Sequence, residues 1–169
     1  MTEIDIAAVI LRGITAIVMF AHGYNHVFRG GKLAGTARWF ESIGIKPGKV
    51  HAALASYTEL GCSVLLALGL ATPLGAAGIC GTMGVALIAN HLKNGFFIFR
   101  PGEGYEYVLT LLCVGLAIGA LGGGSVSLDN AFGIDWSGWG GFATTAGAGL
   151  GGAALLLITC WRRPAPKEA

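Results

Sequence analysis

Five apolar stretches, each long enough or nearly long enough to cross a lipid bilayer as a helix, dominate the sequence. A hydrocarbon core of about 30 Å needs roughly 20 helical residues. The stretches run over residues 6–28, 50–70, 74–92, 105–121 and 142–161, and the fourth is the shortest. The ten-residue polar–apolar alternation of a membrane β-barrel strand does not occur. The sequence therefore predicts an all-α integral membrane bundle.

The composition supports the same fold class. Apolar residues make up 54% of the chain and charged residues only 12%, against about 25% charged in an average soluble domain. A soluble domain with so few charges would lack the polar surface to cover itself, and a net charge of +2 is too small for a nucleic-acid binder. The first stretch does not resemble a signal peptide, because it begins with Glu3 and Asp5 and carries Arg12 inside its apolar run.

The connections between the stretches differ. The basic segment 29–49 contains Leu33, Ala37, Phe40 and Ile43 at helical spacing, which predicts a short helix on the membrane surface. Only three residues separate the second stretch from the third, so these two should form a tight hairpin. The longest connection, between the fourth and fifth stretches, is rich in glycine and serine.

The basic residues predict the orientation. Ten of the eleven fall in three segments that five spans would place on one side of the membrane: Arg29, Lys32, Arg38, Lys46, Lys49, Lys93, Arg100, Arg162, Arg163 and Lys167. Because positive charge stays on the cytoplasmic side, we expect the N-terminus outside and the C-terminus in the cytoplasm of a bacterial inner membrane. Asp129 and Asp135 should then face outward.

Several ionisable residues lie inside the apolar stretches, where a charge costs about 2.5–3.5 kcal/mol on insertion scales. Arg12, His22 and His26 share one face of the first stretch. At a rise of about 1.5 Å per residue, Arg12 lies roughly 9 Å from the outer surface and Glu59 roughly 15 Å. This spacing predicts an Arg12–Glu59 ion pair, with His26 near the interface and solvated.

A second polar layer follows from the same depths. His22 and His91 lie at nearly the same depth in the membrane, and Glu106 lies close to that depth. We therefore expect a His/His/Glu cluster open to the cytoplasm. Three alternatives stay open: the Arg12–Glu59 pair only fixes helix register, the histidines bond to carbonyl groups, and Glu106 caps its helix.

Cysteine and glycine residues give weaker signals. The four cysteines stand singly and none forms a CxxC motif, so a dithiol reaction is not indicated. In the absence of dense Cys/His spacing we expect neither a metal nor a haem. The GxxxG pairs Gly115/Gly119 and Gly147/Gly151 predict close helix packing, within the bundle or with a partner chain.

An ordered set of motifs over residues 7–133 resembles the DoxX family. It comprises His22-Gly23, the segment 35–44, Glu59, His91, and the segments 94–97, 104–107 and 127–129. The family is similar to the large subunit of an archaeal thiosulfate:quinone oxidoreductase, and some bacterial members are linked with thiol-redox complexes. The resemblance therefore implies a four-helix core and a quinone-linked or redox-associated role. The chain departs from many relatives in carrying histidine, not lysine, at position 26.

We accordingly divide the chain into a DoxX-like bundle, residues 1–133, and an extra transmembrane helix with a basic tail, residues 134–169. We expect a redox-linked protein that binds quinone at the intramembrane Arg/Glu/His cluster, and whether it is itself an enzyme stays open. The expected catalytic residues are Glu59, His91 and Glu106, and the expected ligand-binding residues are Arg12, His22, His91, Tyr105 and Glu106.

The alternative function is that of a non-catalytic membrane anchor or assembly subunit. The expected partners are the lipid bilayer, quinone or another small apolar molecule, and either redox-complex subunits or a second copy of this chain. A transporter is disfavoured because the sequence has no inverted repeat.

Overall fold

The computed structural model describes residues 1–164, and within them it contains helices and no strands. The elements are α1 (Glu3–Phe28), α2 (Lys32–Ser42), α3 (Gly48–Leu68), α4 (Thr72–Ala86), η1 (Leu87–His91), η2 (Leu92–Asn94), α5 (Glu106–Leu121), α6 (Leu128–Ala131), α7 (Gly138–Thr145), η3 (Ala146–Leu150) and α8 (Gly151–Cys160). The π-helical turns η1 and η3 continue their neighbours, so α4 runs on to Asn94 and α7 to α8 forms one long helix. The predicted all-α class is confirmed.

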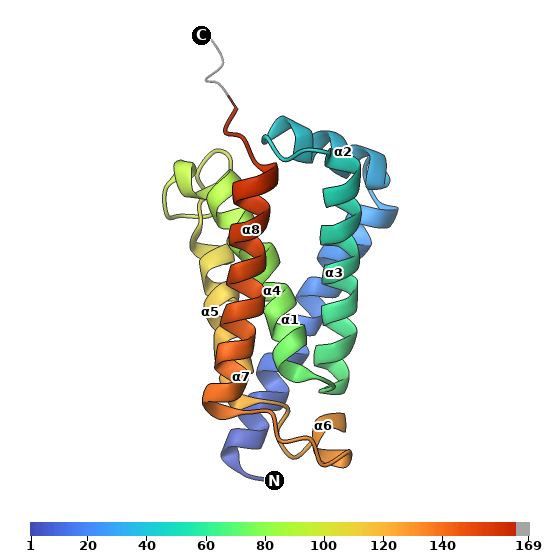
Figure 1. Cartoon of the computed structure of the whole chain (residues 1–169), viewed down its shortest axis with the longest axis vertical. Helices are drawn as coiled ribbons and strands as arrows, with labels where there is room; N and C mark the ends of the chain where they lie inside the picture. The colour runs from blue at the N-terminus through green and yellow to red at the C-terminus, as the bar shows by residue number, and fades with distance from the viewer. Residues whose placement is uncertain (165–169) are drawn as a thin grey trace.

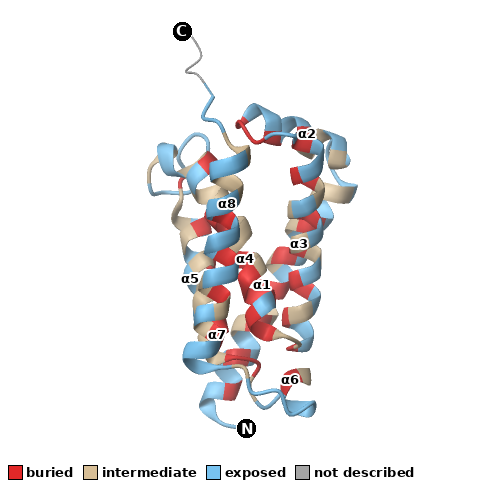
Figure 2. Cartoon of the chain, in the orientation of Figure 1, coloured by how far each residue is buried: buried red, intermediate tan, exposed pale blue. Residues whose placement is uncertain are grey.

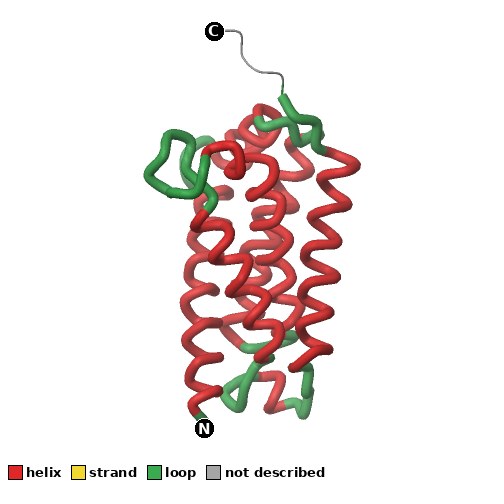
Figure 3. Tube along the Cα trace, turned by 90° about the vertical axis from the view of Figure 1, so that its left-hand side faces the viewer, coloured by secondary structure: helices red, strands yellow, loops and turns green. Residues whose placement is uncertain are grey.

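Five helical passes lie side by side along the long axis of the molecule (Figures 1 and 3). Four are long and apolar enough to cross a membrane: Glu3–Phe28, Gly48–Leu68, Thr72–Asn94 and Gly138–Cys160. The fifth, α5, is a shorter apolar helix of 16 residues. The N-terminus and the end of α8 consequently lie at opposite ends of the bundle. The protein is a helical membrane bundle with a helix beyond the four-helix core.

Much of the helix surface is exposed (Figure 2), and many of the exposed residues are large and apolar. Ile10, Ile17, Leu155 and Ile158 are each more than 60% exposed. Soluble monomers rarely expose continuous apolar surface on this scale. The outer faces of the helices are therefore suited to contact with lipid.

Helix α2, the connection from α4 to α5 and the segment after α8 lie at one end of the bundle, at the top of Figure 1, and because they carry basic residues we call it the basic end. The predicted basic residues lie in or beside α2, in the connection from α4 to α5, or just after α8; Lys167 lies outside the described residues. The opposite end, which we call the N-terminal end, carries the N-terminus and α6. The sequence pattern that places the basic residues at one end is thus reproduced.

Helix α4 is the central helix, and small residues let its neighbours approach it closely. Gly75 and Gly78 face side chains of α3. Gly81 and Gly84 face the last helix, where a Cβ at Gly81 would lie 3.4 Å from the carbonyl oxygen of Gly149. Since lipid tails are as apolar as the helices, such close packing is a main source of their association.

One of the two predicted GxxxG pairs packs as expected. A Cβ on Gly115 would meet Cys80 of α4, and one on Gly119 would overlap Thr145 of α7. Gly147 and Gly151, in contrast, have no other atom within 4 Å of such a Cβ. The glycine that packs against α4 from this helix is Gly149, which lies in the π-helical turn η3.

At the basic end, the predicted surface helix is confirmed as α2, whose Ala37 and Phe40 are buried. The segment after α8 is fastened to the connection between α2 and α3. The amide of Lys46 donates to the Cys160 carbonyl at 3.0 Å, and Arg162 donates back to Gly44 at 2.9 Å. The Trp161 indole donates to the Ile43 carbonyl at 2.9 Å. We call these contacts the terminal clasp.

The five passes predict that two exposed positions are on opposite sides of the membrane. Asp135→Cys, at the N-terminal end, and Arg163→Cys, at the basic end, should not both react with an impermeant maleimide in intact cells. One should react only after permeabilisation, and the unsubstituted protein provides the background. Reaction of both in intact cells would contradict five passes.

Matched alanine substitutions should separate packed from open glycines on the last helix. At Gly149 a new Cβ would lie 2.7 Å from the Ala77 carbonyl oxygen, so Gly149→Ala should lower the free energy of unfolding by about 1–3 kcal/mol. Gly147→Ala meets no atom and should leave it unchanged or raise it by up to about 1 kcal/mol. Unfolding in mixed detergent measures both, and equal effects would refute this packing.

Candidate functional site

Arg12 does not pair with Glu59, so that prediction is wrong. The Arg12 guanidinium is buried near the N-terminal end, where Nη1 donates to the Leu66 carbonyl at 2.9 Å and Nη2 to the Val126 carbonyl at 2.6 Å. The last carbonyl groups of a helix have no partner within that helix, and Arg12 satisfies one at the end of α3. Gly69 is required beside it, because its φ is +62° and a Cβ there would overlap the guanidinium.

Asp129 also lies at this end, the one predicted to be outside, and it fastens the α6 loop to the start of α4. Its side chain is buried and accepts from the amides of Ala71 at 2.7 Å and Thr72 at 3.0 Å, and from the Thr72 hydroxyl at 2.7 Å. The carboxylate thereby caps the start of α4, where a negative charge suits the helix dipole. Asp5 anchors the same loop by accepting from the Ser125 amide at 2.7 Å.

Glu59 pairs instead with His26, which the sequence placed at the interface in solvent. His26 Nδ1 lies 3.0 Å from Glu59 Oε2, and the two side chains are 21% and 5% exposed. The approach is too oblique for a directed hydrogen bond, and neither atom has another partner among the described residues. Both atoms are buried, and the contact is an ion pair when His26 is protonated.

The register between α1 and α3 explains why Glu59 pairs with His26 and not with Arg12. Gly23 lies against Leu60 and the Ser56 carbonyl, and only a glycine permits that approach. Because the helices are antiparallel, Arg12, about three turns earlier, lies opposite the end of α3. Side chains tilt toward the N-terminus of their own helix, so His26 and Glu59 lean toward each other.

Two further groups extend the pair toward α5. The rings of His22 and His26 lie edge to face with centroids 6.4 Å apart. On its other side, the His22 ring stacks on Tyr107 at 6.1 Å, and Tyr107 Oη lies 3.5 Å from His22 Nε2. Tyr107, His22, His26 and Glu59 thus form a line of proton-carrying groups that we call the polar line. It runs from the partly exposed start of α5 to the buried middle of α3.

A cavity of about 250 Å³ opens beside the pair, between the end of α1 and α2. His26, Gly35, Thr36 and Trp39 line it. The Thr36 hydroxyl donates to the His26 carbonyl at 3.2 Å, which fixes α2 against the end of α1. The cavity gives a small ligand access to the imidazole of His26.

The expected His22–His91–Glu106 cluster is not joined by hydrogen bonds or ion pairs in the described part of the chain. His91 Nδ1 lies 3.0 Å from the Glu103 carbonyl, and Glu106 accepts from the Ile98 amide at 3.0 Å. These contacts hold the loop between α4 and α5. The Tyr105 ring packs edge to face on Phe96 at 5.4 Å. The catalytic and binding roles expected for these residues remain predictions.

Sequence reasoning missed Tyr107 and the burial of Asp129. His26 was on the correct face, four residues after His22, but its depth was misjudged. Over residues 1–164, no three His, Cys, Asp or Glu side chains converge in a way that could hold a metal ion.

Comparison with known proteins adds one match. The family model of DoxX matches residues 7–92, half of the chain. This range contains the His26–Glu59 pair, His22 and the cavity under α2, and it ends before Glu106 and Tyr107. No curated protein and no solved structure matches the chain.

Double-mutant cycles should separate the observed pair from the one first expected. His26→Gln and Glu59→Gln should be coupled by about 0.5–3 kcal/mol, because the two side chains touch. Arg12→Gln and Glu59→Gln should be additive within about 0.5 kcal/mol. Unfolding in mixed detergent gives the free energies. Strong coupling of Arg12 with Glu59, and none with His26, would contradict the site described here.

Proposed function

The chain belongs to the DoxX family, and on this premise we propose that it is a redox-linked protein of a bacterial inner membrane that binds a quinone head group beside His26 and Glu59. One observation carries the proposal: His26, which contacts the buried Glu59 carboxylate at 3.0 Å, lines a cavity. Polar groups that converge on a cavity are the usual marks of a binding or catalytic site.

The cavity suits a single ring and not a whole prenylated quinone. Its volume of about 250 Å³ is below the range of roughly 300–1,000 Å³ that is typical for drug-sized ligands, so the prenyl tail would remain in the lipid. Trp39 offers an aromatic face and His26 a nitrogen that can donate a hydrogen bond to a quinone oxygen.

The polar line gives the site a source of protons. Reduction of a quinone consumes protons together with electrons, and a bound quinone would supply that redox chemistry. In this chain, His26 would hold a proton at Nδ1, stabilised by the Glu59 carboxylate 3.0 Å away. His22 and Tyr107 would pass protons from the basic end toward His26. Imidazole suits this task because its charge changes near neutral pH.

We place the basic end in the cytoplasm and the N-terminus outside, following the positive-inside rule. Protons would then enter the polar line from the cytoplasm, at Tyr107. Arg12 has no direct part in this proposal, since it is bonded at the N-terminal end. His91, Tyr105 and Glu106 would contribute only by holding the loop that precedes α5.

A second candidate function, an assembly subunit of a larger membrane complex, is favoured by one observation. Gly147 and Gly151 leave open space on the outer face of the last helix. Small residues of this kind let a helix of another chain approach closely. In that case the last helix, and not the polar line, would carry the function.

Quinone binding is testable with a short-tailed benzoquinone analogue and the purified protein. Glu59→Gln and His26→Gln should each weaken binding about tenfold or more, since a hydrogen bond to a charged group contributes about 1.5–3 kcal/mol. Isothermal titration in detergent measures the affinity. His91→Gln serves as the matched control and should change it less than twofold.

Two results would contradict the proposal. If His91→Gln abolishes binding while His26→Gln does not, the head-group site lies near His91. If Glu59→Gln complements a deletion strain fully, whereas Gly147→Leu with Gly151→Leu does not, the assembly function is correct.

A further inference from the structure

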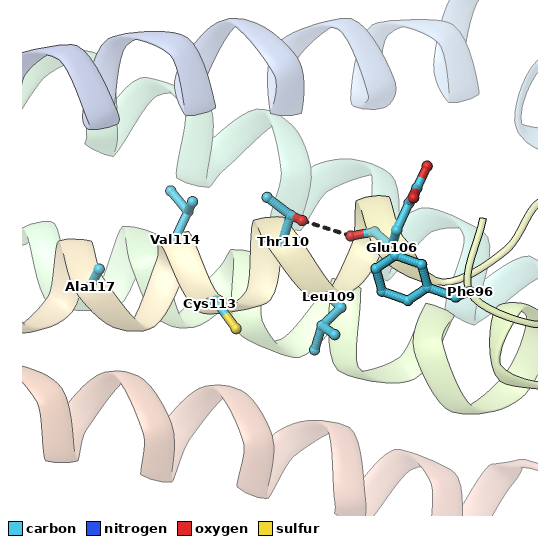
Figure 4. Close-up of a pocket in the computed structure, with 7 residues that line it drawn as sticks. All are labelled: Phe96, Glu106, Leu109, Thr110, Cys113, Val114 and Ala117. Atoms are coloured by element: carbon cyan, nitrogen blue, oxygen red, sulfur yellow. Dashed lines mark hydrogen bonds between the residues drawn. The ribbon is translucent and has the colours of Figure 1, made fainter. Parts of the chain in front are cut away.

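A shallow groove runs along the outer face of α5, separate from the polar line (Figure 4). Its volume is about 410 Å³, and its lining is apolar except at one end. The lining residues are Phe96, Glu106, Leu109, Thr110, Cys113, Val114 and Ala117. The Thr110 hydroxyl is used by the helix itself, because it donates to the Glu106 carbonyl at 2.7 Å. The Glu106 carboxylate is therefore the polar group that the groove offers to a ligand.

The groove has the length of one lipid leaflet. Glu106 and Ala117 are eleven residues apart on α5, which is roughly 16 Å at 1.5 Å per residue. The hydrocarbon core is about 30 Å thick, so the groove spans half of it. It begins at the basic end, where the head groups of that leaflet lie. An acyl chain lying in the groove would thus place its head group beside Glu106.

The charge at the head-group level selects the kind of lipid. Glu106 Oε1 accepts from the Ile98 amide, and in residues 1–164 no lysine or arginine lies within ion-pair distance of this carboxylate. A carboxylate at the edge of hydrocarbon is costly without a cation. A ligand with an ammonium group would neutralise it and donate hydrogen bonds to the second oxygen.

We propose that the α5 groove binds a phospholipid with a primary ammonium head group, phosphatidylethanolamine. One acyl chain lies along Leu109, Cys113 and Ala117, and the ammonium group bonds to Glu106. A quinone tail would fill the apolar part but would bring no cation, and a helix of a second chain would bury the carboxylate. The inference does not rest on quinone binding at His26, which lies on other helices.

Lipid retention tests the proposal directly. Protein delipidated in detergent is incubated with phosphatidylethanolamine, phosphatidylcholine or phosphatidylglycerol, and native mass spectrometry measures the bound lipid. Phosphatidylethanolamine should be retained about tenfold better than phosphatidylcholine, whose quaternary ammonium has no N–H to donate, because charge-assisted hydrogen bonds are worth more than about 1.4 kcal/mol. Phosphatidylglycerol should bind least, since its head group is anionic.

Glu106→Gln removes the negative charge of the side chain and keeps its hydrogen-bond acceptor. The glutamine oxygen still accepts from the Ile98 amide, so the loop should stay in place while the preference for phosphatidylethanolamine disappears. Glu103→Gln, in the same loop but outside the groove lining, is the matched control and should keep the preference. Cys113→Trp fills the groove and should lower retention of every lipid.

Several outcomes would overturn the proposal. Equal retention of phosphatidylethanolamine and phosphatidylcholine would show that the Glu106 charge does not distinguish between the two head groups. An unchanged preference in Glu106→Gln would place the lipid elsewhere. Displacement of the lipid by a long-tailed quinone would assign the groove to that tail, and loss of lipid on dimerisation would assign it to a second copy.

Discussion

The close approach of helix backbones to one another is the constraint on which this bundle depends. Lipid tails are as apolar as the helix surfaces, so the hydrophobic effect does not drive the helices together. They associate through close van der Waals packing instead. The central helix α4 achieves this with glycines on the faces that meet α3 and the last helix. The same device at Gly23 sets the register of α1 against α3. The position of the polar line thus depends on Gly23, whose lack of a side chain sets the alignment of α1 with α3.

Buried charge is used in two different ways at the two ends of the bundle. At the N-terminal end, Arg12 and Asp129 are bonded to backbone groups that the helix ends leave unsatisfied. These bonds join α1, α3, α4 and the α6 loop. Toward the basic end, His26 and Glu59 face each other and no backbone group. The first arrangement holds the fold, and the second places an imidazole at the wall of a cavity.

Much of the fold was predictable because it depends on local pattern. Apolar length predicted five passes, and spacing placed Arg12, His22 and His26 on one face. Pairing across helices was not predictable, because it depends on register. The contact of Gly23 with Leu60 that fixes this register leaves no trace in the spacing of either helix.

Two other features could not be predicted for the same kind of reason. The burial of Asp129 requires the α6 loop to fold back over the start of α4, which no periodicity indicates. On the last helix, Gly149 packs against α4, whereas Gly147 and Gly151 are open, as packing with a partner chain would require.

The terminal clasp also has a mechanical meaning. A helix adapts to a thicker or thinner bilayer by tilting. Because the clasp ties α8 to the connection that follows α2, a tilt of α8 would pull on α2, which forms one wall of the cavity at His26. We expect the width of that cavity to vary with the thickness of the surrounding membrane.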